Sequence, residues 1–414
     1  MSLHEESSGL LGTHVNWEDI EDEVRLSLAT EARFGENKKV ENIGNMKGFM
    51  SKIALISPDW TQDAEILPKK LIVKIVSQLA FVEMSKWSKI ELSEEKLRNF
   101  DEIVSNFHNQ EVGTYELLKQ ENREIPLIKI YASRKITAEN PLKGFIISEF
   151  VEDLKAVTIF DSIEIANILP VVRGIARFSA LAVEFPEKMG FAGSSDFLSK
   201  GLENFSDEKT RENSYKTMRE SFPEEFKEKA EDLIEIYRKV STPEMIRRIT
   251  KIPEICGFAP QLVHGDLWPG NLMFSQNLEL RAIIDWQAVS FGSPSQDLGR
   301  LFITILSTKT YRENLDFLLE TYYHELVKSL EKSPAKPKIP YTLEQLKKNY
   351  QLMFPIVTIL VLPGMISYAE VIGLRDGENR EDLKKSAIEK AVGMMEDVLK
   401  AHRANLIDFP EYFE

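Results

Sequence analysis

The segment His264-Gly-Asp-Leu-Trp-Pro-Gly-Asn271, followed fourteen positions later by Asp285, carries residue types that suit phosphoryl transfer. The Asp266 carboxylate is a candidate catalytic base that orients an attacking hydroxyl. The Asn271 amide and the Asp285 carboxylate offer the hard oxygen ligands that Mg²⁺ prefers, with water and phosphate oxygens completing the octahedron. Phosphoryl transfer needs mainly positioning and charge neutralisation, so a base, a metal clamp and a lysine on the phosphates nearly suffice.

The strands expected around this segment bring the two candidate metal ligands together. Three short strands are expected over residues 261–264, 272–275 and 280–284. The turn-like residues 276–279 join the last two strands and set position 271 opposite position 284. Cross-strand neighbours lie roughly 5 Å apart, so Asn271 and Asp285 emerge at one end of a hairpin. Each residue alone more often caps a turn or ends a strand, and only the combined spacing favours catalysis.

The pattern His-Gly-Asp-x-x-x-x-Asn followed by Ile-Asp-Trp resembles the catalytic and metal-binding loops of kinase-like small-molecule phosphotransferases. That group includes aminoglycoside phosphotransferases, choline and ethanolamine kinases, and the ecdysteroid-kinase-like CHK family. Ile284-Asp-Trp-Gln287 is most similar to the CHK pattern, whereas choline kinases more often show Asn at the position of Gly265 and Glu at that of Gln287. The resemblance implies ATP and Mg²⁺ as cofactors.

The resemblance covers roughly residues 40–400. The further matching segments are Lys47-Gly-Phe-Met-Ser-Lys52, Ile72-Val-Lys74, Asn109-Gln-Glu111 with Tyr115, and Asp297-Leu-Gly-Arg300. Asp297 is expected to brace the catalytic loop by accepting hydrogen bonds from backbone N–H groups. His264 is expected to brace the same loop by donating to a carbonyl, because a lone histidine is more often a fixed core residue than a base.

Lys74 places an ammonium group in the apolar run Leu71-Ile-Val-Lys-Ile-Val76. Burying it without a partner would cost several kcal/mol, so it needs a carboxylate or phosphates, unless it faces solvent on an edge strand. Glu111 on the expected helix 94–119 is the candidate carboxylate, as in the strand-lysine and helix-glutamate pair of kinases. Glu116 competes for that role, and the family pattern Glu-x-x-x-Tyr favours Glu111.

Two further segments are expected to contact ATP. The loop 43–51 contains two glycines but no G-x-G-x-x-G, and its backbone N–H groups near Gly48, with the Ser51 hydroxyl, are candidates for the phosphates. Residues 148–151 are the expected hinge, where the backbones of Glu149 and Val151 would hydrogen-bond adenine.

The predicted fold class is α+β, with a two-lobed protein-kinase-like plan, a small antiparallel-sheet first lobe and a larger helical second lobe. The expected domains are an extension with one helix over 1–39, an ATP-binding lobe over 40–150, and a lobe over 151–414 that holds the catalytic loop, the metal site and the substrate pocket. Strands are expected at 40–55, 71–76, 126–131 and 144–150, and helices at 160–184, 223–249, 311–331, 342–373 and 380–404.

The amino-acid composition disfavours several classes of partner. The formal charge of −14 over 414 residues disfavours nucleic acid and anionic membranes as partners. The most apolar window, 353–366, is too short to span a bilayer and contains two prolines, which favours a buried helix and predicts no membrane span. The single cysteine, Cys256, excludes an intrachain disulfide, and together with the lack of a signal-peptide pattern it predicts a cytoplasmic protein. The oligomeric state is not readable from the sequence.

Several functions compete. A kinase of a small hydroxylated molecule leads, with a steroid-like or other lipophilic alcohol ranked above choline. A choline- or ethanolamine-type kinase is the alternative, with Trp286, Tyr322, Tyr323 and Tyr368 as candidates for an aromatic cage, although helical aromatic residues are usually core. A protein kinase is disfavoured, since Trp-Gln follows Asp285 and no Ala-Pro-Glu follows later. A nucleotide-binding scaffold without activity is the last alternative, and the intact motif residues argue against it.

Overall fold

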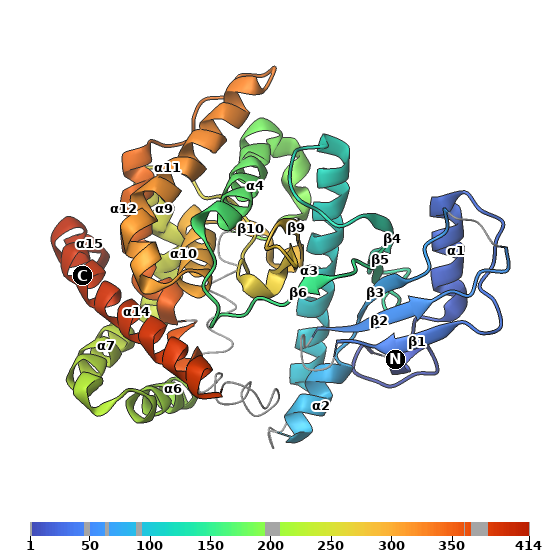
Figure 1. Cartoon of the computed structure of the whole chain (residues 1–414), viewed down its shortest axis with the longest axis horizontal. Coiled ribbons are helices and arrows are strands. Elements are labelled where there is room, and N and C mark those ends of the chain that lie inside the picture. The colour runs from blue at the N-terminus through green and yellow to red at the C-terminus, as the bar shows by residue number, and fades with distance from the viewer. Residues whose placement is uncertain are drawn as a thin grey trace. The chain divides into compact units, whose positions relative to one another are not determined.

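The computed structural model describes most of the chain and divides it into two compact units (Figure 1). The described residues are 2–44, 50–62, 66–87, 93–194, 208–359, 361–365 and 380–413. Unit 1 comprises Met1–Asn122 and Leu127–Leu154, and unit 2 comprises Arg123–Pro126 and Lys155–Glu414.

Unit 1 is built on a five-stranded antiparallel sheet of order β1-β2-β3-β5-β4. The strands are β1 Lys39–Asn42, β2 Ser51–Ser57, β3 Leu71–Val76, β4 Ile130–Arg134 and β5 Phe145–Glu149. Along β3, Leu71, Val73 and Ile75 are fully buried on one face, so Lys74 points to the opposite face. The alternation of residue types along this strand thus decides which face receives the lysine.

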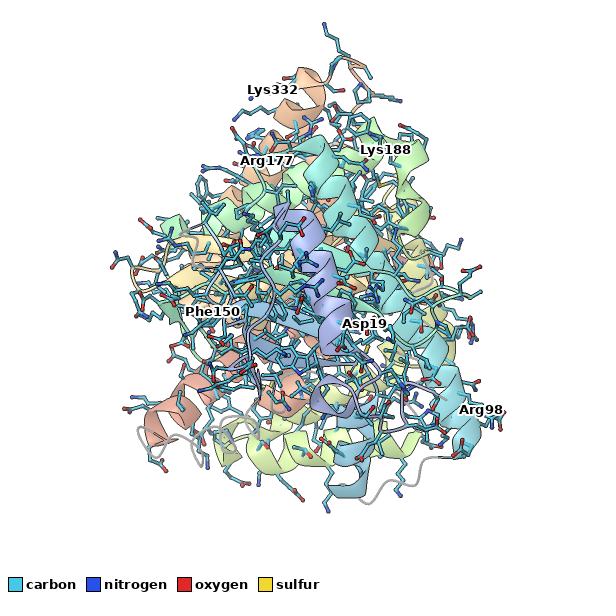
Figure 2. All side chains as sticks on the ribbon, turned by 90° about the vertical axis from the view of Figure 1, so that its right-hand side faces the viewer. Asp19, Arg98, Phe150, Arg177, Lys188 and Lys332 are labelled. Carbon is cyan, nitrogen blue, oxygen red and sulfur yellow. The ribbon has the colours of Figure 1, made fainter. Side chains whose placement is uncertain are left out.

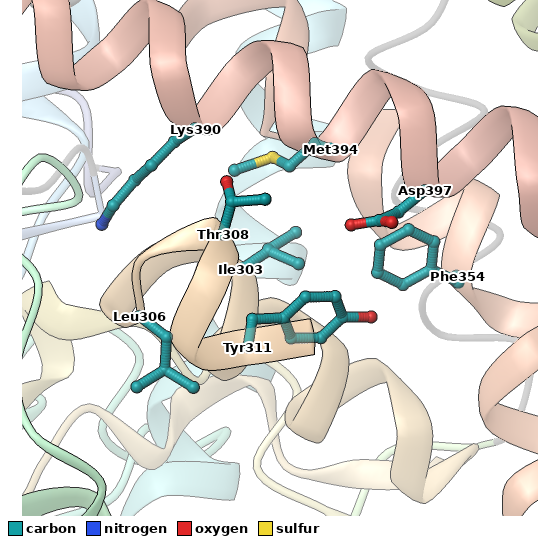
Figure 3. A pocket seen from close by; sticks show the side chains of 8 residues that line it. All are labelled: Ile303, Leu306, Thr308, Tyr311, Phe354, Lys390, Met394 and Asp397. Carbon is teal, nitrogen blue, oxygen red and sulfur yellow. The ribbon is translucent and has the colours of Figure 1, made fainter. Parts of the chain in front are cut away.

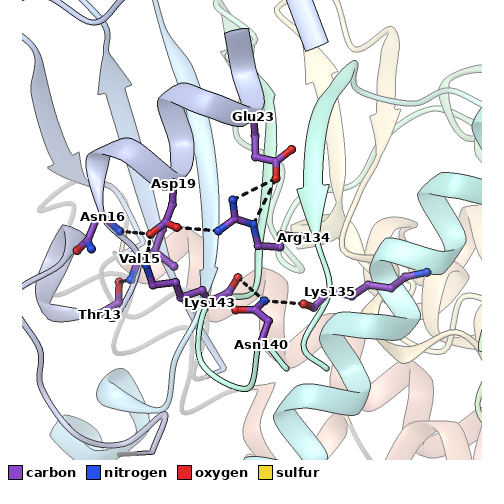
Figure 4. Close-up of polar contacts among 9 residues, drawn as sticks. All are labelled: Thr13, Val15, Asn16, Asp19, Glu23, Arg134, Lys135, Asn140 and Lys143. Carbon is purple, nitrogen blue, oxygen red and sulfur yellow. Dashed lines mark hydrogen bonds and ion pairs between the residues drawn. The ribbon is translucent and has the colours of Figure 1, made fainter. Parts of the chain in front are cut away.

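Helix α1 (Trp17–Leu28) covers the Leu71, Val73 and Ile75 face of the sheet, following the short turn η1 (Leu10–Gly12). Asn16 and Asp19 form a capping box that satisfies N–H groups at the start of α1. Asp19 also accepts from Arg134 and Lys143, both at 2.7 Å, and so joins α1 to β4 and the turn that follows it (Figure 4). A cap residue thereby also fixes the helix on its sheet.

Two further helices belong to unit 1: α2 Leu79–Trp87 and α3 Glu94–Glu121. Ser93 caps α3 by accepting from Lys96 N–H, and Arg98 lies in its exposed first turns (Figure 2). The helix ends where Asn122 adopts a left-handed conformation with φ 41°. The buried residues of α3 concentrate in its second half, and Glu111 lies among them.

Unit 2 is mostly helical. Its α-helices are α4 Ile165–Glu184, α6 Glu208–Ser221, α7 Lys227–Val240, α8 Pro243–Arg248, α9 Ile252–Ile255, α10 Pro294–Ile305, α11 Thr308–Lys332, α12 Leu343–Ile359, α14 Arg380–Asp408 and α15 Pro410–Phe413. Its 3-10 turns are η2 Pro186–Phe191, η3 Glu224–Phe226, η4 Ile249–Lys251, η5 Pro269–Asn271 and η6 Trp286–Ala288.

Two small sheets complete the fold: β6-β8-β9 and β10-β7. Their strands are β6 Leu154–Lys155, β7 Gln261–Val263, β8 Leu272–Ser275, β9 Leu280–Ile283 and β10 Ser290–Gly292.

Helix α4 lies at the centre of unit 2, where it packs against α11, β7 and β9. Among the described helices, α4 is the one that is long and apolar enough to cross a membrane, by length and composition alone. However, 61% of its most apolar 18-residue window is buried within the protein. A core helix passes the same test, so this is weak evidence for a span. At the end of α11, Lys332 lies far out from the core (Figure 2).

A small cavity lies where α10, α11, α12 and α14 meet, and Lys390 and Asp397 are among its lining residues (Figure 3). The Lys390 ammonium donates to the carbonyls of Ile159, Asp161 and Thr304, and its burial lowers the Lys390 pKa to about 8. These carbonyl contacts anchor α14 to the segment before α4 and to α10.

The predicted fold class is confirmed: an antiparallel sheet dominates unit 1, and helices dominate unit 2. The strand predicted over 126–131 is wrong at its start, since β4 begins at Ile130. The Pro126 carbonyl instead accepts from the Ile283 N–H of β9, so residues 123–126 belong to unit 2. The helix predicted over 342–373 is helical over 343–359 and 362–365, and 366–379 lie outside the described residues. Cys256 is buried, and its burial raises the thiol pKa to about 11, as expected for a core residue.

Candidate active site

In unit 1, Lys74 and Glu111 form a short ion pair. The Lys74 Nζ lies 2.6 Å from Glu111 Oε2, and the two side chains are 19% and 3% exposed. The pairing arises because β3 directs Lys74 away from the buried Leu71 face, while the second half of α3 presents Glu111. A carboxylate this buried holds the ammonium in a defined position, which is what a phosphate-binding lysine needs.

The competing partner Glu116 is engaged elsewhere. Its Oε2 lies 2.6 Å from the Nζ of Lys135, and both side chains are more than 40% exposed. The ambiguity between Glu111 and Glu116 is therefore resolved in favour of Glu111 as the carboxylate that pairs with Lys74.

Three of the other predicted nucleotide contacts, Ser51, Glu149 and Val151, lie in or next to strands of the same sheet. Ser51 opens β2 and pairs with Val76, two residues beyond Lys74. Gly48 lies outside the described residues. Glu149 ends β5, where its N–H donates to the Lys129 carbonyl at 2.9 Å and its carboxylate accepts from the Lys129 N–H at 2.7 Å. Val151 follows, half-buried and beyond the end of the strand.

In unit 2, the loop after β7 is fastened by the buried carboxylate of Asp297. One Asp297 oxygen accepts from His264 N–H at 2.6 Å, and the other accepts from Gly265 N–H at 2.9 Å. Burial raises the pKa of the Asp297 carboxyl to about 7, and these two N–H groups act in the opposite direction. The predicted bracing role of Asp297 is confirmed.

His264 is a core residue. It is fully buried, its ring packs against Trp286 at a centroid distance of 4.7 Å, and burial lowers its pKa. Its Nε2 lies 3.0 Å from the Ile284 carbonyl, and its Nδ1 accepts from Asp266 N–H at 3.3 Å. A neutral ring with the proton on Nε2 satisfies both contacts, so His264 donates to a carbonyl as predicted.

Gly265 is the residue that the tight turn before Asp266 requires. Its φ is +84°, and a Cβ placed there would lie 2.2 Å from the Ala288 carbonyl oxygen. Both the backbone angle and the close approach exclude a side chain.

Replacing Gly265 with alanine is therefore expected to lower the free energy of unfolding by about 2–4 kcal/mol. Thermal or urea unfolding measures the change. Gly190→Ala is the matched control, because nothing lies within 4 Å of its added Cβ and its φ is not in the positive range. A Gly265→Ala variant as stable as the Gly190→Ala variant would contradict the described turn.

The hairpin pairing predicted for the candidate metal ligands is confirmed at the end of the hairpin that carries Asn271 and Asp285. Leu272 pairs with Ile283, and the Ile284 N–H donates to the Asn271 carbonyl at 3.0 Å. Asp285 follows directly in a left-handed conformation with φ 64°. The pairing slips between Met273 and Phe274, so the irregularity is confined to the distal end of the hairpin.

The Asp266 carboxylate is held by one hydrogen bond and one ion pair. Its Oδ2 accepts from the Asn271 amide at 2.9 Å, and its Oδ1 lies 2.8 Å from the Arg300 guanidinium. The sequence analysis included Arg300 in a motif and gave it no role. The signal was its spacing, since Asp297 and Arg300 lie three residues apart on α10 and so share a helix face.

The donor set fits Mg²⁺ better than a transition metal. In the part of the chain that the structure describes, no group of three or more His, Cys, Asp or Glu side chains could hold a metal ion. Asn271 and Asp285 offer an amide and a carboxylate, which suits an ion that takes its remaining ligands from water and phosphate.

A family model described as "Uncharacterized oxidoreductase dhs-27", DUF1679, matches residues 3–406. The chain belongs to this family. A curated relative, "Uncharacterized kinase-like protein D1044.1" of Caenorhabditis elegans, is 26% identical over 160 residues, which are 37% of this chain and 41% of that protein. The chain thus aligns with less than half the length of that relative, whose name agrees with the kinase-like resemblance.

Two solved structures are similar over most of their lengths. Choline kinase from Cryptosporidium parvum is 12% identical, with 92% of this chain and 94% of that chain covered and a TM-score of 0.49. The GDP complex of an aminoglycoside 2'-phosphotransferase is 12% identical, with 92% and 99% covered and a TM-score of 0.42. Both TM-scores lie below 0.5, so the fold description rests on the strand order and helices given above.

The five-stranded sheet does not have the features of a dinucleotide-binding oxidoreductase fold, although the family's description contains the word oxidoreductase. Dinucleotide-dependent oxidoreductases with a doubly wound fold use a mostly parallel sheet and a G-x-G-x-x-G turn. Every pairing in the five-stranded sheet is antiparallel, and the full sequence contains no G-x-G.

Proposed function

We propose that this protein is an ATP- and Mg²⁺-dependent phosphotransferase that phosphorylates a hydroxyl group of a small organic molecule. The observation that carries the proposal is the convergence on Asp266. The Asn271 amide contacts the Asp266 carboxylate, and the Asn271 backbone is hydrogen-bonded to the residue just before Asp285. A base and two metal ligands thus arise from one loop and one hairpin, as phosphoryl transfer requires.

Asp266 orients the acceptor hydroxyl and takes its proton as the oxygen attacks phosphorus. Asn271 and Asp285 would hold Mg²⁺ through one amide and one carboxylate oxygen. When bound, the metal neutralises charge on the transferring phosphate. Asp297 and His264 hold the loop backbone, so they act on position and not on the reacting atoms.

Unit 1 supplies the nucleotide contacts in this proposal. Lys74 binds ATP phosphates, and Glu111 fixes the lysine. The Ser51 hydroxyl and the backbone near Gly48 contact the phosphates, and the backbones of Glu149 and Val151 hydrogen-bond adenine. A cytoplasmic location is part of the same proposal.

For the acceptor, we rank an uncharged lipophilic alcohol, such as a steroid-like one, above choline. Two of the aromatic residues considered for a choline cage do not face a solvent-accessible site, since Trp286 and Tyr322 are fully buried. Trp286 donates to the Ile283 carbonyl, and Tyr322 donates to the Ser179 hydroxyl. Tyr323 is half-buried, and Tyr368 lies outside the described residues. The Gly265 and Gln287 positions also resemble the CHK pattern more than the choline kinase pattern.

A coupled ADP-release assay tests the function directly. The acceptor panel contains sterols, other lipophilic alcohols, choline, ethanolamine, aminoglycosides and glucosides. ADP release that depends on Mg²⁺ and on an alcohol supports the proposal, and efficient turnover of choline alone would move the alternative into first place. Nucleotide binding without turnover of any acceptor would identify an inactive scaffold.

Replacing Asp285 with alanine is expected to raise the Mg²⁺ concentration for half-maximal activity roughly tenfold or more, because the strongest charged ligand is lost. Asn271→Ala should shift it less, since an amide carries no charge, and should also lower kcat through its contact with Asp266. Titration of Mg²⁺ at fixed ATP measures both effects. Glu279→Gln, an exposed carboxylate on the same hairpin, is the control. Unchanged metal dependence in both variants would remove these residues from the metal site.

A further inference from the structure

Arg300 contacts the proposed base directly, and the function proposed above gives it no part. Its Nη2 lies 2.8 Å from Asp266 Oδ1, and the two side chains are 24% and 28% exposed. The Asn271 amide donates to the other oxygen, Oδ2. Oδ2 therefore accepts one hydrogen bond, Oδ1 forms one ion pair, and each oxygen keeps a lone pair for an acceptor hydroxyl, so the carboxylate is held from both sides.

The position of Arg300 is itself determined by its surroundings. It lies on α10, one turn after Asp297, which fastens the backbone of the same loop. Its guanidinium carbon lies 6.0 Å from the centre of the Trp268 ring. That ring lies against Gly270, where an added Cβ would approach it to 2.6 Å. The loop's own tryptophan thus packs beside the arginine that contacts the loop's aspartate.

We propose that Arg300 is a positioning residue that fixes the Asp266 carboxylate and, by balancing its charge, disfavours a cationic acceptor. An unpaired aspartate would attract a quaternary ammonium group on the acceptor. The Asp266–Arg300 pair carries no net charge, so it offers such a group no net attraction. This inference rests on the proposed function and adds a residue that selects the class of acceptor.

The size of the charge effect follows from Coulomb's law. Two unit charges about 8 Å apart, near a protein surface with an effective dielectric constant of about 20–40, change an affinity ratio by roughly tenfold. The loss of positioning is larger, because a misplaced catalytic group commonly reduces the rate by roughly a hundredfold.

The experiment compares Arg300→Gln and Arg300→Lys with the wild type and with Arg238→Gln. Arg238 is a suitable control because this α7 residue forms an exposed arginine–glutamate pair with Glu212 of α6, at 3.0 Å. The first measurement is kcat and the KM for ATP, with the best alcohol of the panel as acceptor. Arg300→Gln should lower kcat roughly a hundredfold with a KM for ATP within roughly twofold of wild type. Arg300→Lys should recover part of kcat, since it restores charge without the planar fork.

The second measurement uses two probes of the same shape and different charge: choline and its uncharged analogue with carbon in place of nitrogen. Both are tested as competitors of the best alcohol, so neither needs to be turned over. Arg300→Gln should shift the ratio of inhibition constants toward choline by roughly tenfold. Arg238→Gln should leave the ratio unchanged. A purely structural role for Arg300 would lower activity without moving this ratio.

The outcomes separate the two proposals. A wild type that releases no ADP with any acceptor overturns the proposed function, and this inference with it. An active wild type with an equally active Arg300→Gln variant overturns the positioning role alone. A parallel rise in the KM for ATP also overturns the positioning role, and a probe ratio that does not move overturns the charge-balancing role. Thermal unfolding of each variant confirms that the comparison is made on folded protein.

Discussion

Replacing Asp266 with asparagine is expected to reduce phosphoryl transfer roughly 10³–10⁴-fold, the largest effect expected for any single substitution in this chain. The reason is chemical. The acceptor hydroxyl must lose a proton as its oxygen attacks phosphorus, and an amide cannot accept that proton. The affinity for ATP should stay nearly unchanged, because in the proposed mechanism the carboxylate acts on the acceptor and not on the nucleotide.

The structure adds a second reason for a large loss. Both oxygens of Asp266 face donors, Arg300 on one side and the Asn271 amide on the other. An asparagine must turn its own NH₂ toward one of these donors, so one of the two contacts is lost. The side chain is therefore expected to be less well positioned as well as chemically inert.

Single-turnover ADP release and nucleotide titration measure the two quantities separately. Glu279→Gln makes the same change from carboxylate to amide at an exposed position on the neighbouring hairpin, and should behave as wild type. If Asp266→Asn kept a tenth or more of wild-type turnover, the acceptor base would have to be a different residue.

The geometry of the candidate catalytic loop was predictable because it depends on local spacing. The number of residues between Asn271 and Asp285 fixes the hairpin pairing, and Ile284 lies opposite Asn271 as the turn length predicts. The pairing of Lys74 with Glu111 was predictable only in part, since an ammonium in an apolar strand requires a carboxylate or phosphates. The choice of Glu111 over Glu116 came from the family pattern Glu-x-x-x-Tyr.

Contacts between segments far apart in the sequence were harder to predict. Nothing in the local pattern around Arg300 says that its guanidinium reaches Asp266, because that contact depends on how α10 packs beside the loop. The late start of β4 at Ile130 has a similar origin. The apolar run from Pro126 favours a strand, but the Pro126 carbonyl is used by Ile283 of unit 2, and tertiary pairing overrides local propensity.

Replacing Lys74 with methionine is expected to be the second most damaging single change. The ATP phosphates lose their cation, so the KM for ATP should rise and kcat should fall, together reducing kcat/KM roughly 10²–10³-fold. The sequence alone suggests that an apolar strand tolerates methionine. The structure predicts a stability cost as well, because Glu111 is only 3% exposed and loses a cation at 2.6 Å. Breaking a buried pair from one side commonly costs about 3 kcal/mol or more.

A double substitution separates these two effects. Adding Glu111→Gln to Lys74→Met removes the buried charge, so unfolding measurements should recover most of the lost stability while kcat/KM stays low. Glu111→Gln alone should give a milder kinetic defect that acts through the position of the lysine. Recovery of activity together with stability in the double variant would show that Lys74 has a structural role only.

The exposed pair Lys135–Glu116 provides the matched control within the same unit. Its N–O distance is also 2.6 Å, but its side chains are 41% and 49% exposed. An exposed pair contributes roughly 0–1 kcal/mol, so Lys135→Met and Glu116→Gln should change stability little and leave the KM for ATP unchanged. The two pairs share chemistry and distance, and they differ in burial and in the proposed contact with phosphate. If Glu116→Gln impaired ATP use as much as Glu111→Gln, the assignment of Glu111 as the partner that positions Lys74 would be wrong.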